Sequence, residues 1–154
     1  MPVPAVAKLG LLRTFQQTRI YSKLNCVENM LISHKASDSG FIFAKIPSEL
    51  TEKAENLLNF VGLYQKRNLR AGDLSFGQQK LLELAMALMN EPKMLLLDEP
   101  TEGIAPALTK RIIEILNNLK KQGVTTLVAE SNEKHYEKML DRTFIIERGE
   151  IKLK

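Results

Sequence analysis

Apolar residues along this chain follow two different periods, which predicts helices alternating with strands. Leu81, Leu84, Ala85 and Leu88 recur at helical spacing as one apolar stripe, and an unbroken apolar run, Met94 to Leu97, follows shortly after. The stripe predicts a helix with one buried face, and the run predicts a strand that is buried on both faces, as in a parallel sheet. Together they predict an α/β fold with a mostly parallel sheet.

The same reading predicts the remaining elements. Strands are expected at Leu11 to Phe15, Val124 to Val128, Thr143 to Glu147 and Ile151 to Leu153, with at most a short extended piece at Phe41 to Ala44. Helices are expected from Asn25, from Ser48 to Gly62, from Pro106 to Gly123 and around Asn132 to Leu140. Asn25 and Glu28 have the spacing of a capping box, and Arg148-Gly149 suits the turn of a final hairpin. Leu63 to Asp73 is expected to be a polar connector.

Composition narrows the class of protein. The chain has 154 residues, of which 44% are hydrophobic and 26% charged, as in one ordinary globular domain. No apolar run approaches the length of a membrane-spanning helix, and the prolines and lysine of the first residues make a poor signal peptide. The single cysteine, Cys26, permits no internal disulfide, which agrees with a reducing compartment. A cytoplasmic protein is therefore expected.

The basic residues do not indicate nucleic-acid binding. The formal net charge is +4, and the lysines and arginines are spread over many segments. Nucleic-acid binding is marked by a basic stripe or patch, so scattered basic residues favour a solvated surface. No nucleic-acid partner is expected.

Candidate chemistry lies at both ends of the two strongest elements. Ser75 can cap the helix and Gly77 lets backbone approach a ligand closely, so the exposed N–H groups of that first turn predict a phosphate site. Asp98 and Glu99 follow the apolar strand, where open α/β sheets place ligand groups. Two acids there predict a metal ion and a water molecule. For the acid pair alone, two structural roles stay as alternatives, a helix cap or a pair of acids at the end of the sheet.

Four segments resemble motifs of the ATP-binding-cassette (ABC) ATPases. The stretch from Leu74 to Pro100, LSFGQQKLLELAMALMNEPKMLLLDEP, resembles the signature motif followed by the Walker B motif. The run from Lys8 to Asn29, which contains Arg13-Thr14-Phe15-Gln16, resembles the Q-loop region of the subfamily that includes the branched-chain amino acid importers. Phe76, an aromatic residue where many members have glycine, is typical of that group. Thr101 to Pro106 resembles the D-loop, although Ala105 stands where many members have aspartate.

The resemblance implies roles for several residues. Asp98 would hold a magnesium ion through water, and Glu99 would polarise the attacking water. Gln16 would contact the magnesium ion and the attacking water. The opposite protomer would hold an ATP molecule. Its γ-phosphate would be bound by Ser75, Gly77 and Gln78 of this chain.

At the switch position after the strand Val124 to Val128, many members have a histidine that contacts the γ-phosphate. This chain has Ser131, which is shorter, so weaker phosphate sensing is expected there. His135 is expected to lie inside the next helix and not to replace the histidine.

The resemblance covers the later part of the family's domain. It divides the chain into a Q-loop region (1–24), an inserted α-helical subdomain (25–73), and the signature, Walker B, D-loop and C-terminal core (74–154). No G-x-x-x-x-G-K-[ST] sequence occurs in the chain. We therefore expect a partial P-loop NTPase core without the P-loop strand and the β subdomain that precede the Q-loop in complete members. Without that neighbour, the strand Val124 to Val128 is expected to expose backbone and apolar surface.

The implied function is that of an ATP-binding and ATP-hydrolysing subunit of an importer for branched-chain amino acids or similar small polar solutes. Its cofactors would be ATP and Mg²⁺, and its partners would be membrane subunits and a second ATPase subunit at the inner face of the cell membrane. One alternative is an inactive truncated or split-gene product that needs another chain for the P-loop. Another is the C-terminal lobe of an SMC-like DNA-repair ATPase, which is disfavoured because no heptads precede Leu74.

Overall fold

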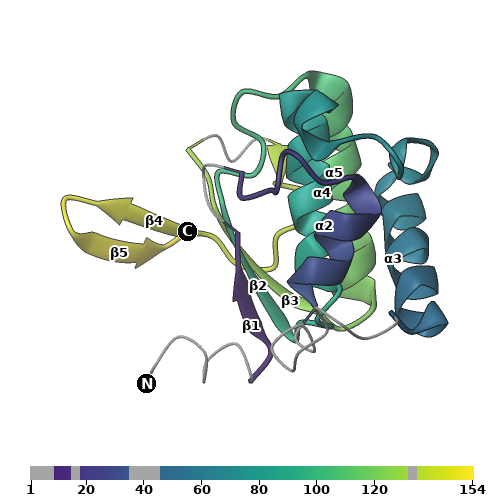
Figure 1. Ribbon diagram of the computed structural model, residues 1–154. Helices are drawn as coiled ribbons and strands as arrows, with labels where there is room; N and C mark the ends of the chain where they lie inside the picture. The colour runs from purple at the N-terminus through teal and green to yellow at the C-terminus, as the bar shows by residue number, and fades with distance from the viewer. Residues whose placement is uncertain (1–8, 15–17, 35–45, 132–134) are drawn as a thin grey trace.

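The computed structural model describes residues 9–14, 18–34, 46–131 and 135–154, and Figure 1 shows how their elements are arranged. Gln16 and the segment Phe41 to Ala44 lie outside these ranges. The elements follow one another as β1 (Leu11–Arg13), α2 (Cys26–Ser33), α3 (Ser48–Val61), the 3-10 helices η3 (Tyr64–Lys66) and η4 (Ala71–Asp73), α4 (Phe76–Leu88), β2 (Met94–Asp98), α5 (Pro106–Lys121), β3 (Thr125–Ala129), β4 (Phe144–Glu147) and β5 (Glu150–Leu153).

The predicted parallel sheet is present, with the apolar strand β2 at its centre. β1 and β3 both pair with β2 in parallel, and Leu12, Leu95 and Thr126 stand side by side in the register. Leu95 and Leu97 are buried, whereas Met94, Leu96 and Asp98 on the other face are half-buried, so the prediction of a strand buried on both faces is wrong for that face. In Figure 1 the helices α2 to α5 lie together on one side of the sheet. The two faces of the sheet are therefore covered unequally.

The predicted helical stripes form the core. Leu81, Leu84, Ala85 and Leu88 of α4 are all buried, as are the apolar positions of α5, which are Ile112, Ile115, Leu116 and Leu119. Helices α2 and α3 pack on α4, and α3 also contacts α5. Among the described residues, no helix combines the length and the apolar character needed to cross a membrane.

Two helix ends form as their sequences predict. The capping box of α2 is complete, because the Glu28 N–H donates to Asn25 Oδ1 at 2.8 Å and the Asn25 N–H donates to Glu28 Oε2 at 2.7 Å. Helix α3 ends at Gly62, whose φ of 86° is a left-handed conformation that glycine adopts without steric cost.

Two predicted segments differ from the structure. The connector 63–73 contains η3 and η4, and its Leu63 and Ala71 are buried, so it is more ordered and more apolar inside than predicted. The helix predicted around Asn132 to Leu140 lies partly outside the described residues, and residues 135–139 form turns instead of a continuous α-helix. Tyr136 packs inward there at 2% exposure, and its hydroxyl lies within 3.4 Å of Thr101 and Glu130. These contacts explain the departure from helical spacing.

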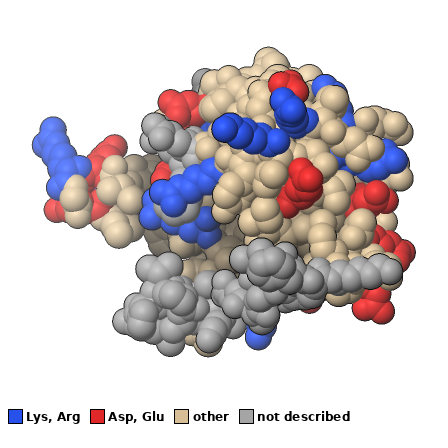
Figure 2. Space-filling model, viewed as in Figure 1, with Lys and Arg blue, Asp and Glu red and all other residues tan. Residues whose placement is uncertain are grey.

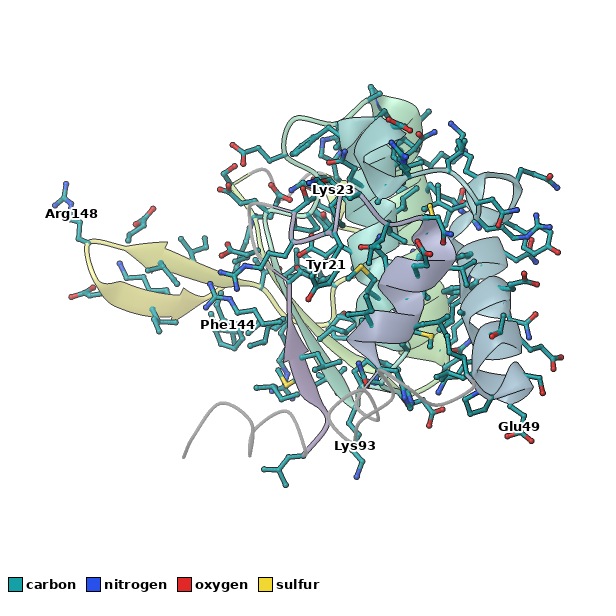
Figure 3. The ribbon with its side chains drawn as sticks, in the orientation of Figure 1. Tyr21, Lys23, Glu49, Lys93, Phe144 and Arg148 are labelled. Atoms are coloured by element: carbon teal, nitrogen blue, oxygen red, sulfur yellow. The ribbon has the colours of Figure 1, made fainter. Side chains whose placement is uncertain are left out.

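The last two strands form the predicted hairpin, which stands away from the rest of the molecule (Figure 1). Its turn residues, Arg148 and Gly149, have φ values of 51° and 83°, which match the twist of a two-residue hairpin. Figure 3 shows Phe144 at the base of the hairpin and Arg148 at its tip. Within the described sheet, β3 is an edge strand and its Leu127 is 51% exposed, as expected for a strand that lacks a neighbour.

Candidate functional site

The acid pair lies at the carboxyl end of the central strand, where the sequence predicts it. Asp98 is the last residue of β2 and stands opposite Ala129 of β3. Glu99 follows, and its N–H donates to the Ala129 carbonyl oxygen at 2.9 Å. Glu99 has a φ of 45°, a left-handed conformation that is uncommon for a residue with a side chain. The chain therefore turns sharply at the residue that carries the second carboxylate.

Arg13 contacts the first carboxylate of the pair. Its Nη2 donates to Asp98 Oδ2 at 3.0 Å, although the two residues are 85 positions apart in the sequence. The parallel pairing of β1 with β2 brings their carboxyl ends together, which places the start of the Q-loop-like segment beside Asp98. Gln16, the residue of that segment predicted to contact metal and water, lies outside the described residues.

Neighbouring acids crowd the second carboxylate. A side-chain hydrogen bond with Glu102, the charge of Glu102 and the charges of Glu130 and Asp98 all raise the pKa of Glu99 above its ordinary value. A divalent cation would relieve this repulsion, and carboxylate oxygens are the ligands that Mg²⁺ takes in proteins. Within the described ranges, no three His, Cys, Asp or Glu side chains form a complete metal site.

The turn before α4 faces solvent, as predicted for a phosphate site. Ser75 is the N-cap residue of the helix and is exposed, and Phe76 next to it is 47% exposed. The Ser75 N–H donates to Gln78 Oε1 at 3.1 Å, and Lys66 Nζ donates to the same oxygen at 3.2 Å. The side-chain oxygen of Gln78 is thus used to hold the turn, a role that its motif position alone does not indicate.

At Gly77 the structure shows a packing role, whereas the sequence predicts close approach of a ligand. It is buried, and a Cβ at this position would lie 2.5 Å from Leu108 Cδ1 and 3.3 Å from Ile104 Cγ2. Leu108 belongs to α5 and Ile104 to the D-loop-like segment. The absence of a side chain lets the first turn of α4 sit directly on these residues, so the candidate phosphate turn and the segment after the acid pair are in contact.

The residue before the switch position is hydrogen-bonded to the segment after the acid pair. Ser131 is exposed and follows β3, two residues beyond Ala129. Glu130, directly before it, accepts a hydrogen bond from Thr101 Oγ1 at 2.8 Å. The Tyr136 hydroxyl lies 3.3 Å from Thr101 Oγ1, and burial raises the pKa of this phenol above its usual range. Sequence reasoning missed this cluster, because no motif or spacing links its three residues.

The face of the molecule drawn in Figure 2 carries charges of both signs. Figure 2 shows lysines and arginines on several parts of one face of the molecule, with acidic side chains between them.

Comparisons with known proteins agree on one family. Residues 7–102 match the profile of a family described as ABC transporter. The high-affinity branched-chain amino acid transport ATP-binding protein LivG of Escherichia coli K12 is 30% identical over 97% of this chain and 62% of its own length. A probable LivG of Archaeoglobus fulgidus is 33% identical over 97% of this chain and 61% of its own length.

Solved structures give the same result. A nucleotide-free ATP-binding cassette from an ABC transporter superposes with a TM-score of 0.81 at 31% identity, covering 96% of this chain and 61% of the cassette. Another cassette of an ABC transporter, in its ADP conformation, gives a TM-score of 0.80 at 34% identity and the same coverage. This chain therefore spans about three fifths of the length of the relatives that it matches.

Proposed function

We propose, from the premise that this chain belongs to the ABC transporter family, that it forms part of an ATP-hydrolysing subunit of an importer for branched-chain amino acids or similar small polar solutes. The observation that carries this proposal is the acid pair Asp98-Glu99 at the carboxyl end of the central parallel strand, one helix after a solvent-facing Ser75 turn. The relatives transport branched-chain amino acids according to their names, and this supplies the class of solute.

The proposed roles of the site residues follow the chemistry of phosphoryl transfer. This reaction needs positioning and charge stabilisation more than covalent chemistry. Asp98 would bind Mg²⁺ through water, and Glu99 would accept a hydrogen bond from the attacking water and polarise it, with Gln16 beside both. The raised pKa of Glu99 supports this role, because the carboxylate takes up a proton more readily than an ordinary one.

The Ser75 turn would serve a nucleotide held by another protomer. Ser75, Gly77 and Gln78 stand at a helix start, where N–H groups and the helix dipole favour an anion. Because the turn faces solvent, it is available to the γ-phosphate of an ATP molecule bound elsewhere. Ser131, exposed at the carboxyl end of the next strand, would contact the same nucleotide weakly.

The phosphate cradle itself must come from another polypeptide segment. The sequence contains no G-x-x-x-x-G-K-[ST] loop, so the described acids alone cannot hold the β- and γ-phosphates. The second candidate function, an inactive chain that works only beside a P-loop-bearing partner, is favoured by the edge strand β3 and by the exposed hairpin residues Phe144 and Ile146. Both surfaces are suited to pairing with further strands.

The proposed partners follow from the same assignment. The relatives are named as transport ATP-binding proteins, so this chain would join a second ATPase subunit and a pair of membrane subunits. It would lie peripherally on the cytoplasmic face of the membrane.

The decisive experiment measures Mg²⁺-dependent ATP hydrolysis. The purified chain is expected to hydrolyse ATP no faster than its Glu99→Gln variant, because the P-loop is lacking. Co-expression with a P-loop-bearing segment, taken from the part of a LivG protein that this chain does not match, is expected to restore hydrolysis, and Glu99→Gln should then lower the rate at least about a hundredfold. If the completed complex is no faster than its Glu99→Gln form, the ATPase assignment is wrong.

A further inference from the structure

A buried lysine stands between the candidate phosphate turn and the acid pair. Lys80 lies on α4 and is 6% exposed, an unusual place for an ammonium group, since burying a charge is costly unless it is satisfied. Its Nζ donates to the carbonyl oxygen of Glu99 at 2.9 Å. The same Nζ lies 5.4 Å from the centre of the Phe76 ring, within cation–π distance.

The carbonyl that Lys80 contacts closes the turn of the acid pair. The Glu99 oxygen also accepts the Glu102 N–H at 3.2 Å, so two donors converge on it. Glu99 itself has a left-handed φ of 45°. A strained residue of this kind persists only where its surroundings hold it in place. Of the two donors, Lys80 Nζ is an ammonium and the Glu102 N–H is a neutral amide. A hydrogen bond from a charged donor is stronger than one from a neutral donor.

Lys80 lines a small cavity together with acidic residues. Glu83 of α4 and Asp98 at the end of β2 line the same small cavity as Lys80. Thr14, at the end of β1, lines that cavity as well. Lys80 therefore lies where α4 and the ends of β1 and β2 meet, close to the acid pair.

We propose that Lys80 is a positioning residue that clamps the Glu99 turn and connects it to the Ser75–Phe76 turn. Through the Glu99 carbonyl, it fixes the backbone from which the catalytic carboxylate projects. Through the Phe76 ring, it links that backbone to the turn that would receive the γ-phosphate. The catalytic part of this inference rests on the proposed function, whereas the clamp itself is a property of the chain.

The clamp is tested first without any reaction, by amide hydrogen exchange of the whole chain. Lys80→Met keeps the length of the side chain and removes its donor, so exchange at the Glu102 amide is expected to rise about tenfold relative to core amides of α4. Lys80→Arg, which keeps a charged donor, should restore most of the protection. Lys110→Met, at an exposed lysine of α5, is the matched control and should change nothing at Glu102. Unchanged Glu102 exchange in folded Lys80→Met would overturn the clamp.

A second measurement needs no variant and remains decisive if Lys80→Met does not fold. In the unaltered chain, the ammonium ¹⁵N signal of Lys80 is expected to be protected from solvent exchange and to show a scalar coupling across the hydrogen bond to the Glu99 carbonyl carbon. Rapid exchange like that of Lys110, with no such coupling, would show that Lys80 does not hold Glu99.

The catalytic arm uses the complex that contains the P-loop-bearing segment. Lys80→Met is expected to lower kcat about tenfold or more with little change in KM, and Lys80→Arg to recover most of it, because the loss is in the orientation of Glu99 and not in nucleotide binding. A KM effect alone would overturn the positioning role. If the unaltered complex shows no hydrolysis, the proposed function fails, while the exchange and coupling results still decide the clamp.

Discussion

At the scale of single residues, Cys26 shows how local packing sets chemistry. The thiol is buried at the start of α2, and its Sγ–H donates to the Lys66 carbonyl at 3.3 Å. Burial raises the pKa of Cys26, with smaller opposing effects from the backbone and from the charge of Lys66. Because the thiolate is the reactive form, this cysteine should be a poor nucleophile at neutral pH.

The first prediction concerns this thiol. In the native chain at pH 7.5, Cys26 is expected to react with a chromogenic disulfide reagent at least about a hundredfold more slowly than in denaturant, since it must wait for local opening. The measurement is the time course of absorbance under both conditions. Equal rates in the two conditions would mean that the helix start is open in solution.

The second prediction concerns Glu99 and pH. Its folded pKa is raised, so between the unfolded value of 4.5 and the higher folded value the native state binds more protons than the unfolded state. The free energy of unfolding therefore falls as pH rises through that interval. Glu99→Gln removes this penalty and is expected to melt at a higher temperature than the unaltered chain at pH 7, with the difference vanishing near pH 4.

Thermal melts of both proteins at the two pH values, in buffer that contains a chelator, test this expectation. Glu137→Gln, at an exposed acid outside the crowded site, is the matched control. A Glu99→Gln variant that melts below the unaltered chain at pH 7 contradicts the repulsion described above.

Residues next to regular elements could be placed from the sequence, and residues that depend on long-range contacts could not. Asp98, Glu99 and Ser75 directly follow or precede an element with a clear apolar period, so their positions follow from it. Arg13 and Lys80 reach partners 85 and 19 positions away, and no local pattern specifies those distances.

At the scale of elements, apolar periodicity predicts α3, α4, α5 and the three parallel strands within a few residues at each end. The pattern fails where a few buried contacts decide the path of the chain. The connector 63–73 folds into two 3-10 helices because Leu63 and Ala71 reach the core, although its sequence is mostly polar. Tertiary packing here outweighs local propensity.

The third prediction belongs to the start of α2. Asn25→Ala removes the side-chain oxygen that accepts the Glu28 N–H, so unfolding free energy is expected to fall by about 1 kcal/mol. Urea denaturation followed by circular dichroism measures the change. Asn56→Ala, at an exposed position inside α3, has no cap to lose and is expected to be neutral or slightly stabilising. Equal losses in both variants would argue against the capping box.

At the scale of the whole molecule, the described sheet is covered by helices on one side and ends at β3. Leu127 on β3 is 51% exposed, and on the hairpin Ile146 and Ile151 are 73% and 69% exposed. Unpaired strand edges beside exposed apolar side chains are sites at which further strands add. In the isolated chain, the available strands belong to other copies, so self-association through this surface is expected.

The fourth prediction tests that surface. Leu127→Lys places a charge on the edge strand and is expected to shift the chain toward monomer in size-exclusion chromatography with light scattering at rising protein concentration, because a lysine there must be desolvated before another strand can pair. Its unfolding free energy should change little, since Leu127 is half-exposed. Ile32→Lys, at a 42% exposed apolar position on α2, is the matched control and should leave association unchanged.

If both variants dissociate equally, general surface hydrophobicity and not the β3 edge drives association. If a P-loop-bearing segment suppresses association as Leu127→Lys does, that segment occupies the same edge.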